Sequence, residues 1–80
     1  MNSEDVILFT RKGCHLCDDA LALLNDHGVE PKLVDIDEDP DLQSRYGAWV
    51  PVVRIDGTDR FRGRIAPRLL KRLLAARRGR

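Results

Sequence analysis

The cysteine pair Cys14 and Cys17 most constrains the fold, because it stands where the hydrophobic period of the chain changes. The apolar run before it, residues 6–10, is typical of a buried strand in a parallel or mixed sheet. From Cys14 to about Asp26 apolar residues recur at helical spacing, at Cys17, Ala20, Leu21 and Leu24. The sequence therefore predicts a strand, a turn at 11–13, and a helix that opens on the cysteines.

The residues that follow predict a second strand and a second helix. Residues 32–37 form the strand, and a strand, a helix and a strand within about thirty residues make a βαβ unit with a right-handed crossover. Asp39 and Pro40 then open a short helix, because aspartate caps a helix and proline suits its first position. This helix is expected to end near Tyr46.

The last third of the chain predicts a hairpin and a helix. Residues 50–55 form a third strand, with Pro51 at its start or on an edge because proline cannot donate to a ladder. Asp56-Gly57 is a hairpin turn signal, and residues 60–62 form the returning strand. A final helix begins near Pro67, with an apolar face of Ile65, Leu69, Leu70, Leu73, Leu74 and Ala76. We therefore expect an α/β fold of order β-α-β-α-β-β-α, in which three helices flank a four-stranded mixed sheet.

Length and composition place the chain among single globular domains. Its 80 residues fit one domain, 1–80, with an ordered core at about 5–76 and a basic tail at 77–80. No stretch of 18 apolar residues is present, and the acidic N-terminus has neither the basic start nor the apolar core of a signal peptide. We expect a cytoplasmic protein that does not bind membranes. In the cytoplasm, a cysteine pair more often has a catalytic or metal-binding role than forms a structural disulfide.

The net charge of +1 hides a strong asymmetry along the chain. All 13 acidic residues lie in 1–59, whereas residues 60–80 carry nine Lys or Arg and no acid. A basic segment can mark a nucleic-acid surface, but no base-stacking aromatic residues are interleaved with these arginines. We therefore expect the two halves to neutralise each other, in a monomer that does not bind nucleic acid.

Two cysteines three positions apart at a helix start can form and break a disulfide. Their Cα atoms would lie about 5 Å apart, within disulfide reach. The free N–H groups and the dipole of the helix start stabilise an anion at Cys14, which makes Cys14 the candidate nucleophile and Cys17 the resolving thiol. Lys12, and His15 when protonated, are expected to lower the pKa of Cys14 further.

Two other interpretations of the pair remain open. A zinc site needs four ligands, and this chain offers two cysteines and two histidines, so a zinc or iron–sulfur centre would have to bridge two chains. We therefore assign no metal ligand within one chain. The domain can also be a non-catalytic module that binds a partner protein.

Three segments together resemble the glutaredoxins of the thioredoxin superfamily: residues 10–17, residues 34–37 and Val50-Pro51-Val52. The Cys-His-Leu-Cys form is similar to a group of small bacterial glutaredoxin-like proteins. The resemblance implies a thioredoxin/glutaredoxin-like fold and thiol–disulfide exchange with a protein or small-molecule disulfide. It also implies a cis Val50-Pro51 peptide beside the cysteines, where Val50 and Pro51 bind the substrate. We expect Trp49, which precedes them, to line the same substrate-binding groove.

The resemblance further makes glutathione the candidate cofactor. Glutaredoxins that use glutathione carry an Arg or Gln shortly before Thr-Val-Pro, and this chain has Gly47-Ala48-Trp49 there. They also carry a Gly-Gly-x-x-Asp-like turn after the last strand, and residues 62–66 here contain one glycine and no acid. Of the usual contacts Lys12 and Val50 remain. We therefore expect dithiol–disulfide exchange and assign no cofactor firmly.

Overall fold

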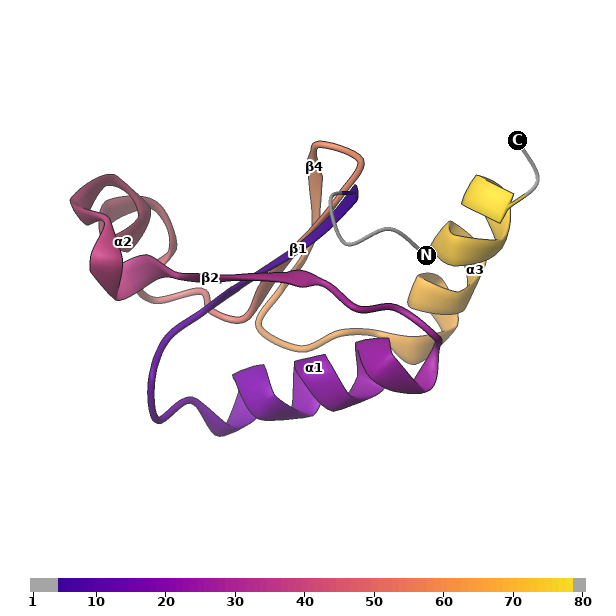
Figure 1. The fold of residues 1–80 in the computed structure, drawn as a ribbon, viewed down its shortest axis with the longest axis horizontal. Coiled ribbons are helices and arrows are strands. Elements are labelled where there is room, and N and C mark those ends of the chain that lie inside the picture. The colour runs from indigo at the N-terminus through magenta and orange to yellow at the C-terminus, as the bar shows by residue number, and fades with distance from the viewer. Residues whose placement is uncertain (1–4, 79–80) are drawn as a thin grey trace.

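The order of elements predicted from the sequence is confirmed by a computed structural model, which describes residues 5–78 (Figure 1). Within residues 5–78, four strands and three α-helices follow one another, with a short 3-10 helix, η2, after the second strand. Their bounds are β1 Val6–Thr10, α1 His15–Asp26, β2 Lys32–Asp35, η2 Ile36–Glu38, α2 Pro40–Tyr46, β3 Val52–Ile55, β4 Thr58–Arg62 and α3 Pro67–Arg78.

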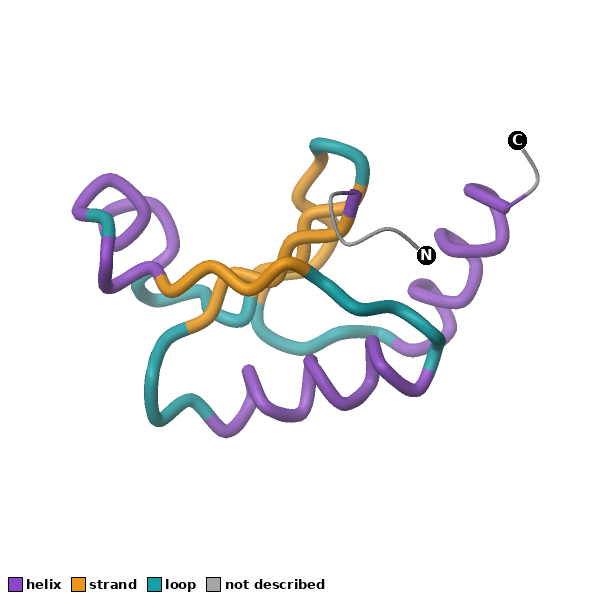
Figure 2. The backbone as a smooth tube through the Cα atoms, in the orientation of Figure 1, coloured by secondary structure: helices purple, strands orange, loops and turns teal. Residues whose placement is uncertain are grey.

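The strands form one mixed sheet in the order β2-β1-β3-β4. β1 is parallel to β2 and antiparallel to β3, and Phe9 pairs with Val34 on one side and Val52 on the other. β4 returns antiparallel to β3 through the predicted Asp56-Gly57 turn, where both residues have positive φ. Because β3 runs opposite to β1, the start of β3 lies at the same edge of the sheet as the end of β1 (Figure 2).

Alternation along the central strands divides the core between the two faces of the sheet. Val6 and Leu8 of β1 pack with α1 and α3, in a cluster that includes Leu24 and Leu70. The intervening Ile7 and Phe9 face the opposite side, where they pack with Val34, Ile36, Leu42, Tyr46, Val50 and Val52. Each face of a pleated strand takes every second side chain, so the short run 6–9 supplies both layers.

Several predicted boundaries are wrong by a few residues, for identifiable reasons. β2 stops at Asp35, because the Asp35 carboxylate accepts the N–H of Asp37 at 2.9 Å and turns the chain into η2. β3 begins at Val52, because Pro51 has no N–H to donate to the ladder. The Val50-Pro51 peptide is cis, as the resemblance implies. The capping of α2 by Asp39, with Pro40 as its first residue, is confirmed.

The C-terminal helix buries a narrower face than predicted. Leu70 and Leu74 are buried and Leu73 is partly buried, but Leu69 is 43% exposed and Ala76 is exposed. The helix reaches Arg78; the side chains of 77 and 78 and the remaining predicted tail, 79–80, lie outside the described residues. Across residues 5–78, no helix combines the length and the apolarity that a membrane span requires.

Candidate functional site

Cys14 and Cys17 lie where β1 passes into α1, and a disulfide joins them. Gly13 makes the turn with φ +75°, a conformation that residues with a Cβ rarely adopt. Cys14 is the N-cap of α1, with extended backbone, and its Sγ accepts the N–H of Cys17 at 3.1 Å. The Cα atoms lie 5.2 Å apart, which confirms the spacing expected from the sequence.

The two cysteines differ sharply in exposure. Cys17 is 2% exposed and belongs to the buried face of α1, whereas Cys14 is partly exposed. An incoming sulfur therefore reaches Cys14 first. At an N-cap, a negative sulfur accepts a backbone N–H and faces the positive end of the helix dipole. Lys12, before the pair, and His15, between the two cysteines, are the residues predicted to tune the pair, and both side chains are exposed to water, which screens charge.

The predicted substrate-binding residues lie at the start of β3. The β1–β3 register pairs Phe9 with Val52, so residues 49–51 lie at the sheet edge from which the chain continues to Cys14. Pro51 is buried, Val50 is partly buried and Trp49 is 55% exposed. The arrangement brings an exposed aromatic ring and the start of a strand to the edge that carries the cysteine loop.

Backbone hydrogen bonds fix the residues on either side of Val50. The N–H of Gly63 donates to the carbonyls of Trp49, at 2.9 Å, and Pro51, at 2.7 Å. The N–H of Trp49 donates in turn to the Tyr46 carbonyl at 2.8 Å. Within the described part of the chain, no hydrogen bond engages the Val50 backbone. Its N–H and C=O therefore remain available to an extended ligand.

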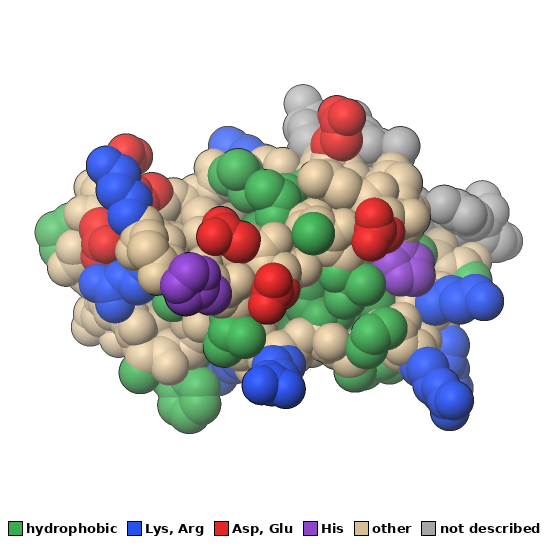
Figure 3. Space-filling model, turned by 90° about the horizontal axis from the view of Figure 1, so that it is seen from below, with side chains coloured by type: hydrophobic (Ala, Val, Ile, Leu, Met, Phe, Trp, Pro, Cys, Tyr) green, Lys and Arg blue, Asp and Glu red, His purple; other side chains and the backbone are tan. Residues whose placement is uncertain are grey.

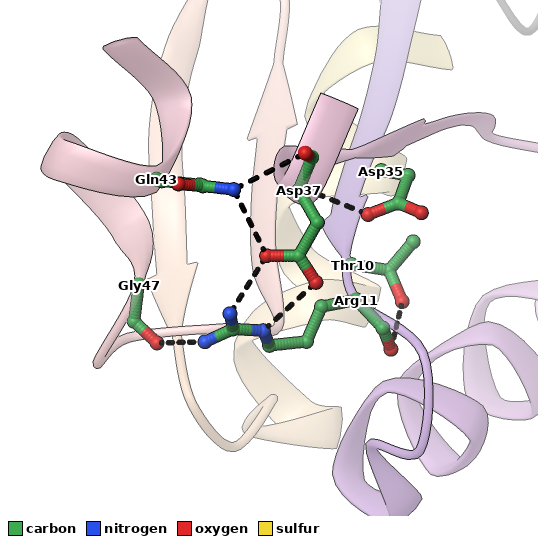
Figure 4. A network of polar contacts seen from close by, with 6 residues as sticks. All are labelled: Thr10, Arg11, Asp35, Asp37, Gln43 and Gly47. Atoms are coloured by element: carbon green, nitrogen blue, oxygen red, sulfur yellow. Dashed lines mark hydrogen bonds and ion pairs between the residues drawn. The ribbon is translucent and has the colours of Figure 1, made fainter. Parts of the chain in front are cut away.

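Arg11 is a site residue that sequence reasoning missed (Figure 4). Its Nη2 and Nε contact the two carboxylate oxygens of Asp37 at 2.7 and 3.3 Å, and its Nη1 donates to the Gly47 carbonyl at 3.1 Å. The sequence held one usable signal. Parallel strands end at the same edge of a sheet, so a basic residue just after β1 and an acidic residue just after β2 were bound to lie close together.

A second missed cluster lies on the face of the sheet that carries Phe9 and α2. The Tyr46 hydroxyl donates to Asp59 Oδ2 at 2.7 Å and accepts from Arg54 Nη2 at 2.8 Å, while Arg54 Nε donates to Asp59 Oδ1 at 2.8 Å. The Tyr46 ring stacks on Phe9, with centroids 4.7 Å apart, and the Arg54 guanidinium lies 4.9 Å from the centre of the Phe9 ring.

Burial and mutual hydrogen bonding shift the pKa values in this cluster in opposite directions. Burial, followed by the hydrogen bond to Asp59, raises the pKa of Tyr46 above its usual range. Burial alone would raise the pKa of Asp59 as well, but hydrogen bonds from Arg54 and Tyr46 outweigh it and hold that pKa below its usual value. At neutral pH the tyrosine is therefore protonated and the aspartate charged, the combination that the hydrogen bonds need.

A hollow of about 260 Å³ lies between α1 and the loop that follows β4. It is lined by Leu16, Asp19, Ala20, Leu23, Gly63, Arg64 and Ile65. Leu16, the residue between His15 and Cys17, is 41% exposed at this rim. On the face seen from the α1 side, exposed hydrophobic side chains lie among acidic ones, and the basic side chains lie nearer the outline of the molecule (Figure 3). Among residues 5–78, no three His, Cys, Asp or Glu side chains gather as metal ligands.

Comparison with known proteins agrees with the geometry of the fold. The glutaredoxin of Archaeoglobus fulgidus is 22% identical, with a TM-score of 0.63 over 88% of this chain and 85% of its own, which shows the fold alone. The holo form of glutaredoxin C1 from Populus tremula x tremuloides is 30% identical, with a TM-score of 0.63 over 90% of this chain and 78% of its own. The thioredoxin/glutaredoxin-like fold predicted from the sequence is confirmed.

A structural-genomics target protein from X. campestris, solved by X-ray crystallography, is also similar. It is 36% identical, with a TM-score of 0.75 over 89% of this chain and 96% of its own. No curated protein sequence matches the chain. The family model described as Glutaredoxin-like domain (DUF836) matches residues 5–77. The match spans nearly the whole chain, which therefore belongs to the glutaredoxin-like domain family.

Proposed function

We propose that this protein is a dithiol–disulfide oxidoreductase in which Cys14 is the nucleophile and Cys17 the resolving thiol. One observation carries the proposal: Cys14 is partly exposed at the N-cap of α1 and accepts the N–H of Cys17, whereas Cys17 is buried within disulfide reach. Thiolates at helix N-termini are stabilised anions, and the exposed sulfur is the one that a substrate reaches.

The chemistry transfers two electrons in two exchange steps. The Cys14 thiolate attacks one sulfur of the substrate disulfide, so that a mixed disulfide forms and the other substrate sulfur leaves as a thiolate. Cys17 then loses its proton and attacks Cys14 Sγ, which closes the Cys14–Cys17 bond and releases the second substrate thiolate. The substrate gains two electrons and two protons, and a thiol reductant must return the pair to its reduced state.

We infer that the substrate disulfide belongs to a polypeptide. Trp49 and Leu16 are large apolar side chains exposed by 55% and 41%, on the two segments that adjoin the cysteines. Exposed apolar groups gathered around a reactive sulfur favour contact with a protein surface. Val50 has no backbone hydrogen bond to any residue of 5–78, which suits an extended segment that would add strand-like hydrogen bonds there.

We also propose that glutathione is a poor reductant for this protein. The loop after β4 carries no acidic side chain, and the N–H of its one glycine, Gly63, is already bound to the carbonyls of Trp49 and Pro51. A glutamyl group therefore finds neither the acid nor the free amide that the resemblance implies for glutathione users. A reductant in the cytoplasm, the compartment we propose, would then be a protein dithiol.

A redox titration with mutants tests the function. The oxidised fraction of the pair should follow a thiol buffer reversibly, with a midpoint of roughly −270 to −180 mV. Cys17→Ser should trap a mixed disulfide on Cys14 in cells, and Cys14→Ser, the matched control, should trap none. Mass spectrometry of the trapped species should find polypeptides rather than glutathione.

Three results distinguish the alternative functions. A pair that does not close in any thiol buffer would refute the oxidoreductase proposal. Full cellular function in Cys14→Ser would favour a non-catalytic binding module. Iron- or zinc-dependent dimers of the purified protein, lost in Cys14→Ser, would favour a metal-bridged dimer over the monomer that we propose.

A further inference from the structure

We propose that Arg11 is a positioning residue, which holds the substrate-binding segment 49–51 in place relative to Cys14. The inference rests on the proposed function, because a substrate must contact both parts at once. Arg11 lies three residues before Cys14 on the loop that leaves β1, and Gly47 lies two residues before Trp49 on the loop that enters β3. The Arg11–Gly47 contact is thus a direct bridge between the nucleophile loop and the substrate-binding loop.

The guanidinium is shared between two acceptors that face it from different elements (Figure 4). Nε and Nη2 form a two-point contact with the Asp37 carboxylate, and Nη1 reaches the Gly47 carbonyl at 3.1 Å. A planar fork with several donors can meet both acceptors simultaneously, whereas a lysine ammonium is a point charge. The geometry therefore depends on arginine, not merely on positive charge.

Asp37 is itself held as a fixed anchor for Arg11. Its backbone N–H donates to Asp35 Oδ1 at 2.9 Å, which ties it to the end of β2. Gln43 Nε2 donates to the Asp37 carbonyl at 3.1 Å and lies 3.4 Å from Asp37 Oδ1, which ties it to α2. Asp35 and Gln43 therefore hold the Asp37 backbone, and Gln43 also contacts the carboxylate, so Arg11 links an anchored group to Gly47.

A purely electrostatic or purely stabilising role for Arg11 fits the structure less well. The positive charge of Arg11 is compensated by Asp37 at 2.7 Å, so little of it acts on Cys14. The two side chains are 39% and 38% exposed, and exposed ion pairs contribute little to global stability. The remaining bonds of the loop, from Trp49 to Tyr46 and from Gly63 to Trp49 and Pro51, do not involve Arg11. Loss of Arg11 should therefore leave the loop folded but less firmly placed.

Kinetics of four variants test the proposal: Arg11→Ala, Arg11→Lys, Asp37→Asn and the double variant Arg11→Ala/Asp37→Asn. With a synthetic peptide disulfide as substrate, we expect KM to rise about tenfold in each single variant, equivalent to about 1.4 kcal/mol of binding. The KM of the double variant should be no higher than that of the single variants, because each of these substitutions breaks the same Arg11 bridge. Arg45→Ala, which removes an exposed arginine of α2, is the matched control and should leave KM unchanged.

Alkylation of reduced Cys14 by iodoacetamide distinguishes positioning from charge. This small reagent does not need residues 49–51, so its rate and pH profile should be the same in Arg11→Ala as in the wild type. A profile displaced to higher pH in Arg11→Ala would show that Arg11 acts by its charge and would overturn the proposal. An unchanged KM in Arg11→Ala, or a double variant whose KM rises by the product of the single effects, would overturn it too.

Hydrogen exchange tests the bridge independently of activity. The Trp49 N–H, bound to the Tyr46 carbonyl, should exchange about tenfold faster in Arg11→Ala than in the wild type, with Arg45→Ala unchanged. Equal exchange rates in Arg11→Ala and wild type would refute the bridge even if the enzyme is active. A wild type that leaves the peptide disulfide unreduced while Arg11→Ala exchanges faster would instead refute the proposed function and leave the bridge supported.

Discussion

Asp59→Asn should destabilise the protein at neutral pH and have little effect in acid. Asp59 accepts the Tyr46 hydroxyl at 2.7 Å and Arg54 Nε at 2.8 Å. An asparagine of the same shape offers one acceptor oxygen and turns an N–H₂ group toward the second donor. One hydrogen bond is therefore lost, and the other loses its charge.

The size of the effect follows from these two contacts. A hydrogen bond to a charged group contributes about 1.5–3 kcal/mol and a neutral one about 0.5–1.5 kcal/mol. The side chains of Arg54 and Asp59 are 29% and 17% exposed, so water partly replaces what is lost. We expect the free energy of unfolding to fall by about 2 kcal/mol at pH 7. For a domain of this size, that lowers Tm by roughly 10 °C.

The pH dependence has a definite sign. The folded-state pKa of Asp59 is lowered, so its contribution is complete above the ordinary carboxyl pKa of about 3.9 and is lost as the pH falls through the lower folded value. Urea unfolding of the two oxidised proteins, followed by circular dichroism from pH 7 to pH 2, should therefore show converging stabilities. Urea is preferred to guanidinium because it does not screen the ion pair.

Two results would refute this reasoning about Asp59. A stability difference that stays constant from pH 7 to pH 2 would mean that the charge of the carboxylate plays no part. A difference below about 0.5 kcal/mol at pH 7, the usual range of surface substitutions, would mean that the cluster does not stabilise the fold. Asp26→Asn, at an exposed position of α1, is the matched control and should stay within that range at both pH values.

Two further substitutions probe the same region. Tyr46→Phe keeps the ring on Phe9 but removes both hydroxyl contacts; urea unfolding should show a loss of about 1–2 kcal/mol at pH 7. Because the folded-state pKa of Tyr46 is raised, that difference should shrink as the pH rises above about 10, and a constant difference would contradict the assignment. Gly47→Ala would place a Cβ 2.7 Å from the Gln43 carbonyl oxygen, so the loop must shift. Urea unfolding should show a loss of about 1–3 kcal/mol, and KM for a peptide disulfide should rise; unchanged values would show that the loop tolerates displacement.

The fold was predictable because its signals are local. The apolar run 6–9, the helical spacing from Cys17 to Leu24 and the Asp56-Gly57 turn each specify one element within a few residues. Boundaries were less predictable where side chains compete with the backbone. Asp35 ends β2 by capping the next turn, an interaction that alternation of apolar residues does not reveal.

The cysteine pair was predictable for the same reason, and its surroundings were not. Cys14 and Cys17 are three residues apart, so helix geometry alone sets their separation. Arg11 contacts residues 26 and 36 positions away, and Tyr46 contacts Asp59 across 13 positions. Strand order and register determine which of these distant residues become partners. Neither can be inferred from a local stretch of sequence before the whole sheet is assembled.

Segment 49–51, for which we propose substrate binding, is held by polar contacts from three directions in addition to the core, which buries Pro51 and contacts Val50. Arg11 reaches it from the cysteine loop through Gly47, the Tyr46 carbonyl holds Trp49 from α2, and Gly63 holds it from the loop after β4. A domain of 80 residues has a thin core and cannot enclose its loops in apolar contacts. Trp49 is 55% exposed, so these hydrogen bonds rather than apolar contacts fix its position, which is the position that our proposal requires for substrate contact. Loss of any one set should therefore weaken substrate docking before it unfolds the protein.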